Sequence, residues 1–448
     1  MKILFISLGC DKNLVDSEVM LGLLTKHGYI LTDDETQADV IVINTCCFIH
    51  DAKEESINTI LEMAQYKEQN LKALVVAGCL AERYKDEILE EIPEIDAVLG
   101  TTSYDSIVEA VNTALEENAG EHFEHYESID YLPDNSNVER VVTTGHHMAY
   151  LKIAEGCDKR CSYCIIPKIR GHFRSVPMEE LLNEAKRLAS EGVKELVLVA
   201  QETTLYGKDL TGEKQLPLLL HELCKIEGIE WIRLLYCYPE EITDELIEVI
   251  KTEEKVCNYI DMPIQHSENR ILQRMGRRTS REDLVAVIKK LRKEIPDITI
   301  RTTLITGFPG ESQEDHEGLM NFVEECKFDR LGVFTYSPEE DTLAATFEDQ
   351  IDEEVKEERR DELMSLQQEI SYEHTQQLVG KTIKVMVEGY LFEDDIYVGR
   401  SYMDAPKVDG CVFINSPEEL MTGDFVYVKI TQGREYDVIG EVDYEFTK

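Results

Sequence analysis

The chain has 448 residues, which is enough for about three domains with substantial cores. Hydrophobic residues make up 43% of the sequence, which excludes an intrinsically disordered protein, and no apolar run approaches the ~20 residues of a membrane-spanning helix. The formal net charge is −44, a field that repels phosphate backbones and favours a basic partner, although the same acidity also keeps a protein soluble.

Cysteine usage and the start of the chain indicate the compartment. Residues 1–10 are too short an apolar stretch for a signal peptide and run directly into polar sequence. The chain has twelve cysteines, and without a secretory signal such thiols are more often metal ligands in a reducing cytoplasm than disulfides. We therefore expect a cytoplasmic protein without a membrane segment.

Residues 1–115 alternate strand and helix patterns. Short β-branched runs at 2–8, 40–44 and 73–77 predict buried parallel strands, and helical patterns at 16–27 and 53–66 separate them. This alternation predicts a doubly wound, flavodoxin-like α/β domain.

One cysteine follows each of these three strands: Cys10, Cys46 and Cys79. The carboxyl ends of parallel strands gather at one edge of a doubly wound sheet, so the three thiols should meet in space. Scattered cysteines are usually unrelated buried thiols, but the same placement recurs three times here. The pattern therefore favours a cluster held by three thiolates. The neighbouring Cys47 should point the other way along a continuing strand and is expected to be a bystander.

A polar segment with turn residues, 116–145, predicts a linker to a second alternating region at 146–375. Strand patterns there lie at 149–154, 195–200, 231–236, 259–264, 299–306 and 331–336, and helical patterns lie at 178–191, 216–226, 243–251, 281–294 and 314–326. Six such βα units imply right-handed parallel crossovers and a partial (βα)6 barrel of the TIM type. Its site should lie at the carboxyl ends of the strands, where Gln201, Glu202 and Gly307 fall.

The first strand of this barrel runs into three thiols in C-x3-C-x2-C spacing, Cys157, Cys161 and Cys164. Three cysteines within eight residues can converge on one metal centre but cannot complete four-coordination. A structural zinc site would need a fourth ligand, and the nearest candidate is His172. A cubane iron–sulfur cluster on three thiolates instead keeps one iron open for a substrate or cofactor. The spacing favours the iron–sulfur cluster.

The last part of the chain changes character. Residues 352–374 form a long, highly charged helical pattern suited to spanning between domains. Five short strand patterns follow within 376–448 and predict a small β-barrel of the oligonucleotide/oligosaccharide-binding kind. This segment has 7 Lys and Arg against 14 Asp and Glu, a net charge of 7 − 14 = −7.

Taken together, the chain resembles the methylthiotransferases of the radical S-adenosylmethionine (SAM) superfamily over its whole length, and among them those that modify a ribosomal-protein aspartate. The resemblance is carried by three groups of stretches. They are the cysteine loops Gly9–Glu18, Asn44–Ile49 and Gly78–Leu80, the loop Ala149–Gly171 around C-x3-C-x-aromatic-C, and the stretches Met262–Ser267 and Thr306–Glu311. The family has a cysteine-bearing first domain, a radical SAM barrel and a TRAM barrel in this order. Its pattern has Gln-Asp where this chain has Gln201-Glu202.

The resemblance implies two [4Fe-4S] clusters and SAM. The cluster on Cys157, Cys161 and Cys164 would reductively cleave SAM, with Tyr163, Gln201, Glu202 and Gly307 at the bound cofactor. A second cluster on Cys10, Cys46 and Cys79 would hold the sulfur, and the product would be a methylthiolated aspartate β-carbon. The implied partners are a basic small-subunit ribosomal protein at the decoding centre and an electron donor such as flavodoxin.

Two rival functions remain open at this point. A tRNA adenosine methylthiotransferase would share the chemistry and differ in target, but the acidic final barrel disfavours RNA binding. A non-catalytic iron–sulfur electron carrier with an RNA-binding tail would need no open irons, yet neither cysteine set has a fourth cysteine nearby.

Overall fold

The first domain is a six-stranded parallel sheet in the computed structural model, which describes residues 1–85, 87–116, 122–136 and 138–445. The strand order is β2-β1-β3-β4-β5-β6, and its first five strands have the flavodoxin order, which confirms the predicted fold class. The strands are β1 (Lys2–Ser7), β2 (Ile30–Thr32), β3 (Val40–Thr45), β4 (Ala73–Gly78), β5 (Ala97–Leu99) and β6 (Phe123–His125). The helices are α1 (Asp11–Lys26), α2 (His50–Ala64), α3 (Cys79–Arg83), α4 (Ile88–Glu91) and α5 (Ile107–Leu115).

Two of these elements differ from the sequence prediction. Helix α1 begins at Asp11, five residues before the predicted 16–27 pattern, because its first turns bury polar side chains against the second domain. Strand β6 lies inside the segment 116–145 that was predicted to be a linker, and it pairs in parallel with β5. Three residues are too short for a periodic signal, so only the sheet reveals this strand.

The central domain is an open barrel made of two three-stranded parallel sheets. Their orders are β11-β10-β7 and β12-β13-β14, and a single bridge between Ile232 and Val256 joins them. The strands are β7 (Met148–Lys152), β10 (Glu195–Val199), β11 (Trp231–Leu234), β12 (Tyr259–Asp261), β13 (Thr299–Thr306) and β14 (Arg330–Thr335). A short ribbon of β8 (Ala154–Glu155) and β9 (Arg174–Ser175) flanks the cysteine loop. The partial (βα)6 barrel is thereby confirmed.

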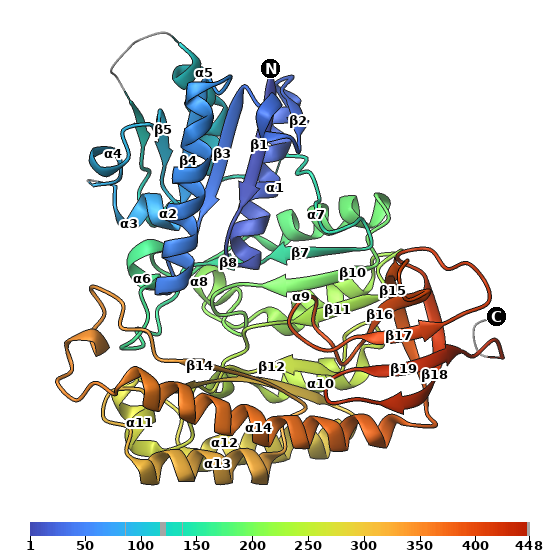
Figure 1. The fold of residues 1–448 in the computed structure, drawn as a ribbon. Helices are drawn as coiled ribbons and strands as arrows, with labels where there is room; N and C mark the ends of the chain where they lie inside the picture. Colours follow the sequence, from blue (N-terminus) through green and yellow to red (C-terminus); the bar gives the residue numbers. More distant parts are fainter. Residues whose placement is uncertain (86, 117–121, 137, 446–448) are drawn as a thin grey trace.

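Helices cover the outside of this barrel. They are α7 (Met178–Ser190), α8 (Lys208–Thr211), α9 (Leu216–Cys224), α10 (Asp244–Thr252), α11 (Asn269–Arg274), α12 (Arg281–Glu294), α13 (Gln313–Cys326) and α14 (Glu353–Leu378). The short helix α6 (Ile166–Ile169) instead packs against α3 of the first domain. Helix α14 lies along α13 and reaches the last domain (Figure 1). Leu363 and Ile370 on α14 are buried in the barrel core, so this helix is part of the barrel as well as a link between domains. In the described part of the chain, no helix combines the length and apolar character needed to cross a membrane.

The last domain is a closed five-stranded barrel in the order β15-β16-β17-β19-β18. Its strands are β15 (Thr382–Leu391), β16 (Ile396–Ser401), β17 (Val412–Asn415), β18 (Phe425–Gly433) and β19 (Val438–Val442). Buried ion pairs fix it to the central barrel: Arg400 Nη2 lies 2.6 Å from Glu195 Oε2, and Arg330 Nη2 lies 2.5 Å from Asp404 Oδ1. Because Glu195, Arg400 and Asp404 are buried at this contact, the last barrel is firmly attached to the central one.

In Figure 1 the first domain stands on the central barrel, with β1 and β3 ending toward it, while the last domain lies at the side. The carboxyl ends of the first sheet therefore face the region of β8 and α6, where the second set of cysteines is found.

Candidate functional site

The thiols of the first domain lie at the ends of three neighbouring strands. Cys10 directly precedes α1, Cys46 directly follows β3, and Cys79 begins α3 after β4. Since β1, β3 and β4 are adjacent in the sheet, these residues come to one edge, as the sequence predicts. Cys47 is fully buried in the core on the α2 side of the sheet, and its Sγ lies 3.1 Å from the Cys79 carbonyl oxygen.

Side-chain hydrogen bonds hold these three loops together. Asn13 Nδ2 donates to the carbonyl oxygens of Leu8 and Thr45, at 2.9 Å each. Ser56 Oγ accepts from the Cys46 N–H at 3.0 Å and donates to the Cys46 carbonyl at 2.8 Å. The cysteine edge is thus assembled by protein contacts alone.

Gly9 allows the closest approach of these loops. It has φ +88°, and a Cβ built on it would lie 2.6 Å from Cys46 Cβ and 2.8 Å from Cys46 Sγ. No side chain fits there, and the left-handed backbone is costly for other residues. Gly9 is therefore required for Cys10 to come next to Cys46.

The second set of thiols lies in the loop between β8 and α6. The Cys157 N–H donates to the Gly171 carbonyl at 3.1 Å, and the Cys164 N–H donates to the Cys161 carbonyl at 3.0 Å. Ser162 bonds to the far side of the barrel, with its N–H donating to the Met275 carbonyl at 2.9 Å. The loop is therefore folded back on itself and anchored to α11.

The zinc alternative loses its fourth ligand in this structure. His172 is exposed, and its Nδ1 pairs with Asp158 Oδ1 at 2.7 Å instead of turning to the thiols. Within the described ranges, no three His, Cys, Asp or Glu side chains close around one point as a single ion requires. Thiolates of a four-iron cluster each bind a different iron, so they lie further apart than the ligands of a single ion.

Burial is the main influence on these thiols. It raises the pKa of Cys157 to about 12 and raises the pKa of Cys46, Cys79 and Cys164 as well. The Arg170 guanidinium acts in the opposite direction and limits the rise of the Cys79 pKa. Metal coordination deprotonates a thiol outright, so bound iron would offset the free-energy cost of ionising these buried thiols.

Of the residues expected at SAM, Tyr163 and Gly307 come together. The Tyr163 ring packs edge-on against Phe308, next to Gly307, with 6.4 Å between ring centroids. Gln201 Nε2 donates to Glu155 Oε1 at 2.6 Å, which leaves Gln201 Oε1 buried without a hydrogen-bond partner. These positions line the mouth of the barrel beside the cysteine loop.

Glu202 is fully buried, and its Oε2 has no hydrogen-bond partner. Burial raises its pKa to about 7, and the nearby Lys159 ammonium, 3.6 Å from Oε2, limits the rise. Its other oxygen accepts from the Thr204 backbone N–H at 3.1 Å. The additional methylene of Glu relative to Asp is therefore accommodated by contacts within the barrel.

A buried ionic network joins the two sets of cysteines. Arg170 Nη1 lies 2.8 Å from Asp16 Oδ2 and 3.1 Å from Glu155 Oε2, and its Nη2 lies 3.5 Å from Cys79 Sγ. Lys152 Nζ contacts the same two carboxylates and lies 2.8 Å from Glu155 Oε2. Glu155 stands two residues before Cys157, so Arg170 connects the two cysteine regions directly.

Sequence reasoning named none of these four charged residues as functional, although Asp16, Glu155 and Arg170 lie within the stretches that carry the family resemblance. Their burial was the missing signal. In a sequence, an isolated charged residue is normally predicted to be exposed to solvent. Here the docking of the first domain on the barrel buries these side chains.

A further cation lies beside the first cysteine set. Lys12, in the first turn of α1, is 6% exposed, and its Nζ lies 3.4 Å from the centroid of the Tyr236 ring. Burial lowers the pKa of Lys12, whereas Tyr236, Asp11 and Cys10 raise it, and the net shift is upward.

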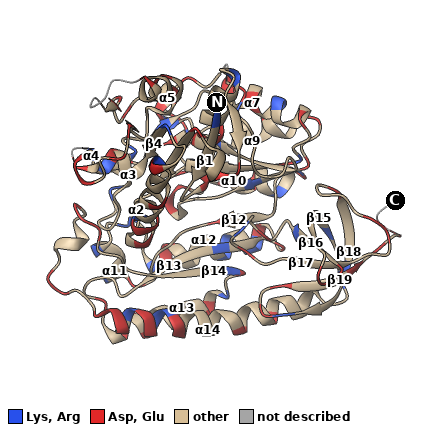
Figure 2. Ribbon diagram, turned by 45° about the horizontal axis from the view of Figure 1, so that its top comes forward, with Lys and Arg blue, Asp and Glu red and all other residues tan. Residues whose placement is uncertain are grey.

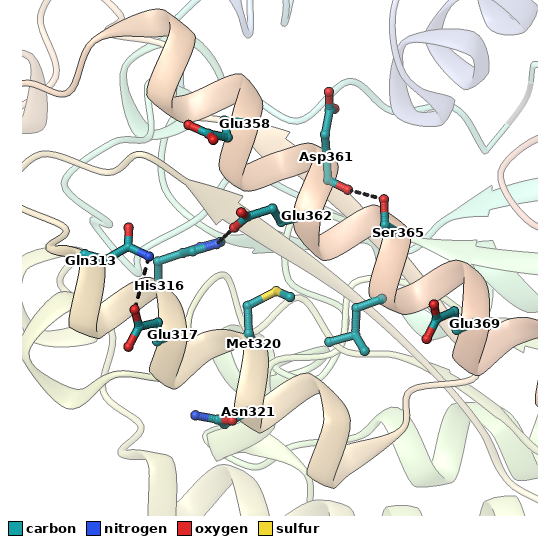
Figure 3. A pocket seen from close by; sticks show the side chains of 11 residues that line it. Gln313, His316, Glu317, Met320, Asn321, Glu358, Asp361, Glu362, Ser365 and Glu369 are labelled. Carbon is teal, nitrogen blue, oxygen red and sulfur yellow. Dashed lines mark hydrogen bonds and ion pairs between the residues drawn. The ribbon is translucent and has the colours of Figure 1, made fainter.

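A surface groove lies elsewhere, between α13 and α14. It measures about 1100 Å³ and is lined by acidic side chains that include Glu317, Glu358, Asp361, Glu362 and Glu369 (Figure 3). Figure 2 shows the acidic residues gathered along these two helices. None of the thiols discussed above lines this groove, so it is not the redox site.

Comparison with protein-family models finds three matches in chain order. Residues 2–100 match the uncharacterized protein family UPF0004, residues 151–323 match the radical SAM superfamily, and residues 379–442 match the TRAM domain. Among solved structures, the radical SAM methyltransferase TsrM from Kitasatospora setae with cobalamin and [4Fe-4S] cluster bound has a TM-score of 0.57 at 14% identity. The match covers 85% of this chain and 78% of that one, a likeness of fold.

Curated relatives match along the full length. A protein of Lachnoclostridium phytofermentans is 62% identical over 99% of this chain and 100% of its own, and one of Acetivibrio thermocellus is 51% identical over 100% and 99%. A third, of Desulfitobacterium hafniense, is 51% identical over 98% of each chain. All three are named ribosomal protein uS12 methylthiotransferase RimO. The chain therefore belongs to the RimO family of radical SAM methylthiotransferases and is an enzyme of that kind.

Proposed function

We propose that this enzyme methylthiolates the β-carbon of an aspartate in ribosomal protein uS12. The observation that carries the proposal is the full-length likeness to uS12 methylthiotransferases at 50–62% identity. It is supported by Arg170, which contacts Cys79 of the first domain and Glu155 beside the cysteine loop of the barrel. The tRNA adenosine alternative has no comparable support among these relatives.

Membership of the radical SAM superfamily implies a [4Fe-4S] cluster and SAM. We assign the cluster to Cys157, Cys161 and Cys164, with Tyr163, Gln201, Glu202 and Gly307 near SAM. We assign a second cluster to Cys10, Cys46 and Cys79. When bound, these groups supply the carbon-centred radical chemistry and the sulfur that no side chain of the protein could provide.

The residues of the chain contribute position and exclusion of water. Arg170, Asp16 and Glu155 lock the cysteine edge of the first sheet onto the barrel mouth, so the two sites face each other at a fixed separation. Five of the six thiols are buried or half-buried, which keeps water away from a reactive intermediate. Cys10 is exposed and marks the side from which substrate would enter.

Charge supports a protein substrate. The last barrel carries Glu393, Asp394 and Asp395 in the turn between β15 and β16, and its net charge of −7 includes three residues outside the described ranges. Such a surface steers a basic ribosomal protein toward the enzyme and repels RNA phosphates. A small acidic carrier such as flavodoxin is the proposed electron donor, and action on a ribosomal protein would place the reaction in the cytoplasm.

The domain division that we propose follows the same lines. A cysteine-bearing domain covers 1–115, a connecting segment covers 116–145, and the radical SAM barrel and TRAM barrel cover 146–375 and 376–448. Strand β6 lies in the connecting segment but belongs structurally to the first sheet.

The deciding experiment offers the anaerobically reconstituted enzyme two targets in parallel, uS12 and an anticodon stem-loop RNA that contains the relevant adenosine. Mass spectrometry should show the gain of a methylthio group on one aspartate of uS12 and no change in the RNA. A mass gain on the RNA alone would overturn the proposal.

A further inference from the structure

Four lysines are buried in the described part of the chain, and Lys12 differs from the other three. Lys152, Lys159 and Lys356 each have a carboxylate oxygen between 2.6 and 2.9 Å from Nζ. For Lys12, the one carboxylate oxygen within ion-pair range among described residues is Asp11 Oδ2 at 3.8 Å, too far for a hydrogen bond. Lys12 therefore rests on Tyr236 and, unlike the other three, has no described carboxylate within hydrogen-bond distance.

The neighbouring residue, Asp11, has a carboxylate oxygen that lacks a hydrogen-bond donor. Asp11 Oδ2 is buried and has no hydrogen-bond partner. Buried charged groups without partners are expensive, and where a structure retains them a ligand commonly completes the set. A ligand here must therefore bring an acceptor for Lys12 and a donor for Asp11.

The backbone around these residues favours a negative group. Lys12 is in the first turn of α1, a helix of 16 residues whose N-cap, Cys10, gives no side-chain capping bond. The first N–H groups of such a helix are unsatisfied and carry the positive end of its dipole. The N-terminus of α1 therefore stabilises a bound carboxylate.

Tyr236, which packs on the Lys12 ammonium, places this point between the two cysteine sets. It has φ +59°, a strained conformation for an aromatic residue, held by a hydrogen bond from its N–H to Asp261 Oδ2 at 3.0 Å. Two residues on, Tyr238 lies near Cys157 and Cys161. The segment 236–238 thus runs from the Lys12 side of the interface to the second cysteine set.

We infer that Lys12 binds the side-chain carboxylate of the substrate aspartate, and that Asp11 accepts a backbone N–H of the same peptide. This inference rests on the proposed function. The carboxylate is one bond from the β-carbon that must lie between the two cysteine sets, and burying it there requires a cation. Arg170 and Lys152 are already saturated by Asp16 and Glu155, which leaves Lys12 for the substrate.

The test measures binding as well as turnover. Two peptides that copy the target segment of uS12, one with Asp and one with Asn at the modified position, are titrated against the reconstituted full chain by fluorescence anisotropy. Wild-type enzyme should bind the Asp peptide in preference. Lys12→Met should weaken binding of the Asp peptide roughly ten- to hundredfold, the range of a charge-assisted hydrogen bond, and should bring the Asp/Asn ratio close to one.

Two further variants separate this role from a structural one. Lys12→Arg keeps the charge and should restore part of the preference for Asp. Lys26→Met removes an exposed charge from the last turn of the same helix and should leave the ratio at the wild-type value. In turnover, Lys12→Met should raise KM for the Asp peptide while 5′-deoxyadenosine formation without peptide continues.

The outcomes distinguish the inference from the function on which it rests. If Lys12→Met weakens both peptides equally, or neither, Lys12 is a cation–π packing group and the inference is wrong while the function stands. If the wild-type enzyme modifies only the RNA stem-loop, the proposed function and this inference fall together.

Discussion

The two sets of cysteines are brought together by opposite routes. Cys157, Cys161 and Cys164 lie within eight residues of one loop, whereas Cys10, Cys46 and Cys79 are spread over 70 residues and meet only because three strands are neighbours. The set in the barrel loop depends on local backbone geometry, and the set in the first domain depends on the whole sheet. Damage to the packing of the first domain should therefore disrupt Cys10, Cys46 and Cys79 while it spares the barrel loop.

Removing each set outright should have the largest effect and should separate their roles. Replacing Cys157, Cys161 and Cys164 by Ala should abolish cleavage of SAM to 5′-deoxyadenosine while iron bound by the other set persists. Replacing Cys10, Cys46 and Cys79 should leave that cleavage intact and abolish sulfur transfer. Iron and sulfide analysis should fall in both variants from about eight of each per chain to about four, as expected for two cubanes.

The assignment of separate roles is wrong if the variant without Cys10, Cys46 and Cys79 still methylthiolates uS12, because the sulfur would then come from another source. It fails equally if the wild-type protein, with every cysteine intact, reaches only about four irons. Liquid chromatography with mass spectrometry measures 5′-deoxyadenosine and the modified protein, and iron analysis measures the metal content.

Arg170→Gln should come next in size, because Arg170 is the group that both regions share. The substitution leaves Lys152 as the one described cation that remains at the buried Asp16 and Glu155 carboxylates, a loss of about 3–5 kcal/mol for a broken buried pair. Urea unfolding of the apo-protein measures it. Arg187→Gln is the matched control: its surface pair with Glu191 on α7 should contribute less than about 1 kcal/mol.

Gly9→Ala probes the sheet-dependent set alone. The new Cβ would collide with Cys46, and the left-handed backbone adds about 1–2 kcal/mol of strain. We expect about four irons per chain instead of eight, with SAM cleavage retained. Gly28→Ala is the control, because Gly28 has φ +87° but open space around its Cβ position. Gly28→Ala should show the backbone strain and keep all the iron; equal iron loss in both variants would rule out the steric explanation.

Ser56→Ala should have the smallest effect. It removes the hydroxyl that bonds both the N–H and the carbonyl of Cys46, a loss of about 1–3 kcal/mol because a buried N–H is left unpaired. Second-cluster iron should be lost faster to a chelator, with the first cluster unaffected. Thr59→Ala, on the exposed face of α2, should match wild type. Identical chelation rates for all three proteins would show that Ser56 does not hold the Cys46 loop.

Much of the architecture followed from the sequence. Apolar β-branched runs fixed β1, β3 and β4 to within a residue at each end, because strands buried on both faces leave little choice of residue. The same regularity placed Cys10, Cys46 and Cys79 at one edge. The order of βα units determined the partial barrel, and five short strand patterns determined the last barrel. These signals are local, or depend only on the direction of the chain.

What the sequence alone left undecided lies where domains meet. The helical pattern was predicted to begin at residue 16, yet Lys12 and Asn13 before it are helical and buried. His172 was a candidate zinc ligand by spacing, and only the fold directs it to Asp158. The roles of Arg170 and Lys12 likewise follow from their neighbours. A polar side chain in a sequence predicts solvent, and only tertiary structure can replace that solvent with a partner of opposite charge or with a place for a substrate.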